Sequence, residues 1–130
     1  MEDRITERKD KLLLEAQKLE IEGKNITKTI EKYKEAYNCG AKEEASLRLV
    51  NFYFNQAILY KKESFFNDLY KWGINFYLYN PKYIIDIFVY IWIISDNDDF
   101  KNKILHFIID KSKSYNYAQE KLNYIMEKIK

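Results

Sequence analysis

Apolar residues recur along the chain at the three- and four-residue spacing of amphipathic helices, with charged residues between them. The pattern predicts seven helices, and the breaks between them are short and polar. The expected helices are residues 4–22, 26–38, 42 to the polar turn at 61–63, 65–79, 82–95, 99–112 and 117–129. Three glycines and one proline are too few for a fold rich in β-turns, so we expect an all-α fold.

The breaks carry residues that end or begin helices. Gly23 and Gly40 suit the left-handed backbone conformation that commonly follows the last turn of a helix. Other breaks offer side chains that accept hydrogen bonds from the free N–H groups of a following helix. The predicted N-caps are Asn25, Ser64 and Asn80.

Apolar positions also repeat over a longer distance. Tyr33, Tyr70 and Phe107 are separated by equal steps of 37 residues. The same step relates two further sets, which are Leu13, Val50 and Ile87, and Ala16, Tyr53 and Tyr90. A repeat of this length is typical of stacked helical hairpins. Chance alignment of apolar positions in an all-helical chain remains the alternative.

The repeat predicts one domain, residues 1–130, built from three stacked antiparallel hairpins and a final helix. The hairpins are expected at residues 4–40, 41–79 and 80–115, and the capping helix at 116–130. A single hairpin cannot bury both faces of its helices, so hairpins stack and the inner helices become apolar on most sides. The predicted helices that start at Lys42 and Lys82 show this character.

The best-preserved junction carries a family resemblance. The stretch IEKYKEA at 30–36, GAKEEA at 40–45, and then Leu49 and Tyr53 resemble the Sel-one-like and tetratricopeptide repeat families. The resemblance covers about residues 29–54. Val50 stands where these families usually have glycine, and the third copy has Asp110 where they have a small residue.

The resemblance implies a non-enzymatic, adaptor-like or chaperone-like module. In these families the first helices of the pairs line a concave groove that holds a peptide or protein segment. The groove candidates on the first helices are Lys11, Lys18, Arg48, Asn51, Asn55 and Trp92. Arg48, Asn51 and Asn55 are polar on an otherwise apolar helix, although simple exposure at a helix end explains them equally well. A tryptophan such as Trp92 is more often a core residue than a binding residue.

Charge and aromatic content leave two alternatives open, which are a small nucleic-acid-associated or viral or phage helical protein and a homo-oligomeric structural protein. The 22 Lys and Arg against 20 Asp and Glu give a net charge of +2, a weaker basic bias than nucleic-acid binders usually show. A basic cluster at the N-terminus is diluted by acidic neighbours; its members are Arg4, Arg8, Lys9 and Lys11. The aromatic residues between Phe65 and Tyr90 also suit a self-interface in a homo-oligomeric structural protein.

Residues that carry chemistry are scarce. Cys39 is the only cysteine and His106 the only histidine, which excludes an intramolecular disulfide and argues against a Cys/His zinc site. The acidic run Asp96–Asp99 lacks the glycine and glutamate of a calcium-binding loop. No phosphate-binding or nucleophile motif is present, so we expect no catalytic residues, metal or cofactor.

The sequence also bears on location. The N-terminal residues are charged and lack the apolar stretch of a secretory signal. The most apolar run, residues 83–94, is shorter than the roughly 20 residues that span a bilayer. We therefore expect a cytoplasmic protein without membrane segments.

Overall fold

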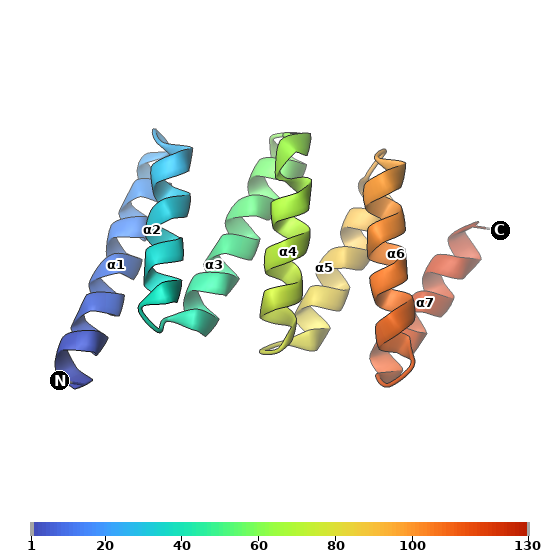
Figure 1. Ribbon diagram of the computed structural model, residues 1–130. Coiled ribbons are helices and arrows are strands. Elements are labelled where there is room, and N and C mark those ends of the chain that lie inside the picture. The colour runs from blue at the N-terminus through green and yellow to red at the C-terminus, as the bar shows by residue number, and fades with distance from the viewer. Residues whose placement is uncertain (1, 130) are drawn as a thin grey trace. The chain divides into compact units, whose positions relative to one another are not determined.

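The computed structural model describes the backbone of residues 2–129 and the side chains of residues 7–129. It confirms the all-α fold class: 85% of the chain is helical, and the described part contains no strand. The α-helices are α1 (Glu2–Glu22), α2 (Ile26–Asn38), α3 (Lys42–Phe54), α4 (Phe66–Tyr77), α5 (Pro81–Ile94), α6 (Asp98–Ser112) and α7 (Asn116–Ile129) (Figure 1). A π-helical turn, η1 (Asn55–Leu59), and a 3₁₀ turn, η2 (Glu63–Phe65), lie between α3 and α4.

Local signals set most of the helix ends. The Asn25 side chain accepts from the Lys28 backbone N–H at 2.9 Å, and the Asn80 side chain accepts from Tyr83 at 3.1 Å. Gly23 and Gly40 adopt φ of 68° and 110°, which glycine reaches without steric strain. These predicted caps and stops are confirmed.

The predicted cap at Ser64 is wrong. The 3₁₀ turn η2 precedes α4, so Ser64 lies inside the turn and not at the cap position. The turn closes through its backbone, with Phe65 N–H donating to the Lys62 carbonyl at 3.0 Å. The helix α4 then begins at Phe66 without a side-chain cap.

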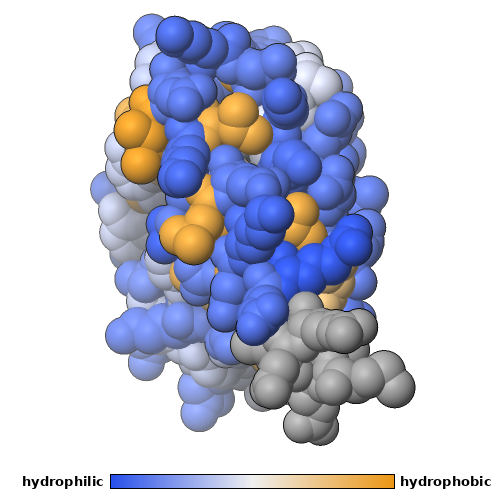
Figure 2. All heavy atoms as spheres, turned by 90° about the vertical axis from the view of Figure 1, so that its left-hand side faces the viewer, coloured by the Kyte–Doolittle hydropathy of each residue, from blue (hydrophilic) through white to orange (hydrophobic). Residues whose placement is uncertain are grey.

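The chain folds as two compact units, Met1–Tyr53 and Phe54–Lys130. In the first, α1 and α2 form an antiparallel hairpin, and α3 follows (Figure 1). Its core joins Leu12 on α1 to three alanines, Ala36, Ala41 and Ala45. Small side chains let helices approach closely. Hydrophilic residues cover most of the side where α1 lies, and apolar residues form small separate patches there (Figure 2).

In the second unit, helices α4 to α7 alternate in direction. Helices α4 and α6 form one layer, and α5 and α7 form the other (Figure 1). The core of this unit is strongly aromatic: the Phe88 ring stacks on Tyr70 with centroids 5.7 Å apart and meets Phe107 edge-on at 5.2 Å. Gly73 completes the contact, because a Cβ added there would lie 2.7 Å from the tip of the Phe88 ring.

The two units correspond to no predicted boundary between hairpins. Tyr33, Tyr70 and Phe107 lie on α2, α4 and α6, respectively. The first residues of the helices are spaced less regularly than these apolar residues, since Lys42 and Pro81 are 39 residues apart and Pro81 and Asn116 are 35 apart. The single domain and the stacking of three repeats into one solenoid remain predictions. Within residues 2–129, no helix combines the length and apolar character needed to cross a membrane.

A strained residue follows the π-helical turn and its capping residue Tyr60. Lys61 has φ of 55°, in the left-handed region that glycine prefers, and Lys62 N–H donates to the Gln56 carbonyl at 3.0 Å. We expect Lys61→Gly to raise the free energy of unfolding by about 0.5–1 kcal/mol, because it removes this strain. Chemical denaturation measures the change. Lys62→Gly is the matched control, since Lys62 has φ of −92° and gains nothing from glycine.

Candidate interaction surfaces

The six predicted groove residues are divided between the two units. The first unit holds Lys11 and Lys18, exposed on α1, and Arg48 and Asn51 on α3. The second unit holds Asn55 in η1 and Trp92 on α5. Arg4, which belongs to the predicted basic cluster, has a side chain outside the described residues.

Arg48 takes part in a polar network inside the first unit. Its Nε donates to the Glu44 carboxylate at 2.9 Å, and this hydrogen bond raises the pKa of the guanidinium. Nearby, the fully buried Tyr33 hydroxyl donates to the Glu20 carboxylate at 2.6 Å. Glu44 and Arg48 act on the Tyr33 pKa with opposite signs, which places all four groups within electrostatic reach. Arg48 therefore has a structural partner already.

Trp92 is mainly a core residue. Its side chain is 9% exposed, and the Lys101 ammonium group lies 4.4 Å from its ring centroid. Asn55 is half-buried, and its backbone carbonyl accepts from Tyr60 N–H at 3.0 Å. Little of the Trp92 ring is left for contact with a binding partner.

An exposed surface lies on α5 and α7, and we call it the α5–α7 face. Its residues share one side of each helix; they are Lys82, Asp86, Tyr90 and Ile93 on α5, and Tyr117, Lys121, Tyr124 and Lys128 on α7. The Tyr117 hydroxyl donates to the Asp86 carboxylate and ties the two rows together. Tyr90 is 50% exposed, and Ile93 and Tyr124 are exposed to a similar degree.

Lysines surround the aromatic residues of the α5–α7 face. The ammonium groups of Lys82 and Lys121 each lie 5.3 Å from the Tyr117 ring centroid, and Lys128 lies 5.2 Å from that of Tyr124. The hydrogen bond to Asp86 raises the pKa of Tyr117 to about 12. The face therefore offers apolar contacts beside positive charge.

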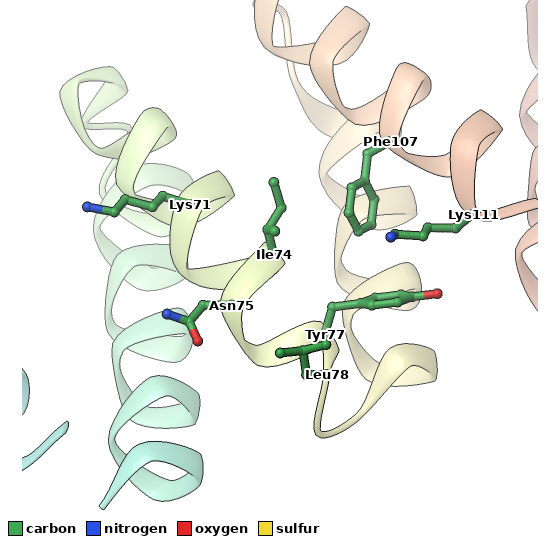
Figure 3. Close-up of a pocket in the computed structure, with 7 residues that line it drawn as sticks. All are labelled: Lys71, Ile74, Asn75, Tyr77, Leu78, Phe107 and Lys111. Carbon is green, nitrogen blue, oxygen red and sulfur yellow. The ribbon is translucent and has the colours of Figure 1, made fainter. Parts of the chain in front are cut away.

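A second surface is a hollow between α4 and α6, which we call the α4–α6 hollow (Figure 3). It has a volume of about 420 Å³ and is lined by Lys71, Ile74, Asn75, Tyr77, Leu78, Phe107 and Lys111. Figure 3 shows the Lys111 amine pointing into the space between the Phe107 and Tyr77 rings, whereas the Lys71 amine points away. The Lys111 ammonium lies 4.9 Å from the Tyr77 ring centroid and 5.3 Å from that of Phe107.

The sequence interpretation did not select these residues for the groove, although Tyr77 and Tyr90 belong to the aromatic segment that it proposed as a self-interface. The sequence did contain a signal for the α5–α7 face. Asp86 is charged within an otherwise apolar helix, and Tyr90 follows it by four residues and so lies on the same side. The hollow has no such signal, since it depends on how α4 packs beside α6.

Among the residues that the structure describes, no three His, Cys, Asp or Glu side chains form a group that could hold a metal ion. No family model matches the chain, and no curated protein or solved structure matches it either.

Proposed function

We propose that this chain is a non-enzymatic protein-interaction module, adaptor-like or chaperone-like, that binds a peptide or protein segment. The observation that supports it most is the α5–α7 face, where exposed Tyr90, Ile93 and Tyr124 lie among lysines. Exposed aromatic residues beside apolar ones are typical of protein interfaces. In a tetratricopeptide-like arrangement, α5 is a first helix and would contribute to the concave groove.

The chemistry of this face favours a protein segment over a nucleic acid. Single-stranded nucleic acids stack their bases on open aromatic rings. Here lysine ammonium groups already lie over Tyr117 and Tyr124. Ile93 adds aliphatic surface that suits a protein side chain, and the net charge of +2 supplies little general attraction for phosphates.

A display selection tests the proposal. Random peptides are selected on the immobilised full chain, and the affinities of enriched peptides are then measured for the native protein and two variants. We expect Tyr90→Ala and Tyr124→Ala each to weaken binding about tenfold, the loss of roughly 1.4 kcal/mol that truncating an interface aromatic residue commonly causes.

Tyr60→Ala is the matched control, because Tyr60 is also an exposed tyrosine but lies outside α5 and α7. Its variant should bind the enriched peptides as the native protein does. Failure to enrich any peptide, or equal affinities for all the variants, contradicts the proposal. Light scattering at high concentration tests the self-interface alternative, and a mass above that of a monomer would favour it.

A further inference from the structure

We propose that the α4–α6 hollow is a separate docking site for an amphipathic protein segment that carries a carboxylate beside its apolar stripe. The site involves the other layer of the second unit, so it does not depend on the α5–α7 face. Lys111 supplies the positive charge, and Ile74, Tyr77, Leu78 and Phe107 supply the apolar walls (Figure 3).

Lys111 is the feature that specifies the charge of the occupant. Its side chain is two-thirds buried and points into the hollow between two aromatic rings (Figure 3). The carboxylate paired with it belongs to the adjacent Asp110, 3.8 Å away and 67% exposed. Such an exposed ion pair contributes little to stability. A carboxylate that entered the hollow would meet the ammonium where less water screens the attraction.

The lining of the hollow specifies the rest of the occupant. No acidic residue lines it and the Lys111 amine points into it, so its charge favours an anionic partner (Figure 3). Its volume of about 420 Å³ falls in the range of roughly 300–1,000 Å³ that organic ligands occupy, well above the needs of a small inorganic ion. The space fits an apolar side chain together with a carboxylate.

The surroundings of the hollow favour a chain segment over a small molecule. Ile74 on α4 and Leu78, which follows the last residue of α4, are four residues apart, and Leu78 lines the hollow while 83% exposed. An amphipathic helix presents apolar residues at the same three- and four-residue spacing, so it can contact this row along its length.

Two capped helical peptides test the site. Each peptide is about 16 residues long and carries leucines along one side of the helix. The two sequences differ at one position beside the leucines, which is Glu in one peptide and Gln in the other. They are titrated into the full chain while the backbone amides are followed by NMR. We expect the Glu peptide to shift the amides of residues 74–78 and 107–111. It should bind about tenfold more tightly than the Gln peptide, the equivalent of about 1.4 kcal/mol.

Substitutions identify the groups responsible. Lys111→Met should remove the preference for Glu, so that both peptides bind with the lower affinity. Lys71→Met is the matched control, because the Lys71 amine points away from the hollow, and it should change either affinity by less than about twofold (Figure 3). Leu78→Ser should weaken both peptides equally. The amide spectrum of each free variant establishes that it is folded.

Several outcomes overturn the inference. Equal losses in Lys71→Met and Lys111→Met indicate unspecific charge attraction, and shifts confined to α5 and α7 place the peptide on the other face. Absence of binding by both peptides removes the site. Octanoate is titrated separately; shifts from octanoate without shifts from the peptides identify a site for small carboxylic acids. Tyr90→Ala should leave the affinity for the Glu peptide unchanged, because Tyr90 lies on the α5–α7 face. A failure of this inference can therefore be distinguished from a failure of the proposed function.

Discussion

Replacing Phe88 with alanine is expected to lower the free energy of unfolding of the second unit by about 3–5 kcal/mol. The Phe88 ring is fully buried and contacts the rings of Tyr70 and Phe107. Its removal loses the transfer free energy of the ring and leaves a cavity, because the helices around it can relax only in part. Urea denaturation followed by circular dichroism measures the loss.

Tyr90→Ala is the matched control for this substitution. Tyr90 lies two residues further along α5 and is 50% exposed, with its ring 6.0 Å from that of Phe54. We expect a loss of about 0.5–1 kcal/mol, the scale of one aromatic pair at a surface. Equal losses for the two variants would show that Phe88 is not a central packing residue.

Gly73→Ala tests the same contact from its other side. Alanine favours helix by roughly 1 kcal/mol over glycine, so an unobstructed position would gain stability. Here the added Cβ meets the Phe88 ring at 2.7 Å, and we expect a net loss of about 1–2 kcal/mol. The double variant with Phe88→Leu should lose less than the sum of the single changes. Additive losses in denaturation would contradict this coupling.

Helix positions could be predicted because their signals are local. Asn25, Gly40 and Asn80 act on backbone groups within a few residues, and the structure uses all three as expected. The end of α3 was not predictable in this way. The π-helical turn and the left-handed Lys61 depend on the path of the chain into η2, and a lysine carries no signal for that conformation.

The candidate surfaces were less predictable than the fold, because periodicity cannot tell which apolar residues find partners. Helix α5 is apolar on nearly all sides, and only Lys82 and Asp86 mark the side on which Tyr90 is half exposed while Trp92 is buried. Arg48 carried a usable signal, since Glu44 precedes it by four residues and such pairs commonly interact on a helix. The position of the Lys111 ammonium group in the α4–α6 hollow could not be predicted, because it depends on how α4 and α6 pack.

The second large effect concerns a long-range contact in the first unit. Tyr33→Phe is expected to lower the free energy of unfolding by about 1.5–3 kcal/mol at neutral pH. The substitution keeps the ring and removes the hydroxyl, which leaves the half-buried Glu20 carboxylate without the donor now 2.6 Å away. Tyr60→Phe is the matched control, since Tyr60 is exposed, and should change stability by less than about 0.5 kcal/mol.

The same hydroxyl should make stability depend on alkaline pH. Burial first, and then the hydrogen bond to Glu20, raise the pKa of Tyr33 above its ordinary value of 10.0. The unfolded chain therefore loses this proton near pH 10 while the native protein keeps it. The contribution of the neutral phenol is fully present below pH 10. As the pH rises above 10, it is lost at up to about 1.4 kcal/mol per pH unit. Between neutral pH and about pH 11, the free energy of unfolding from denaturation should fall less steeply with pH for Tyr33→Phe than for the native protein. Parallel curves would mean that this proton stays equally bound in both states, and that the contact with Glu20 does not stabilise the fold.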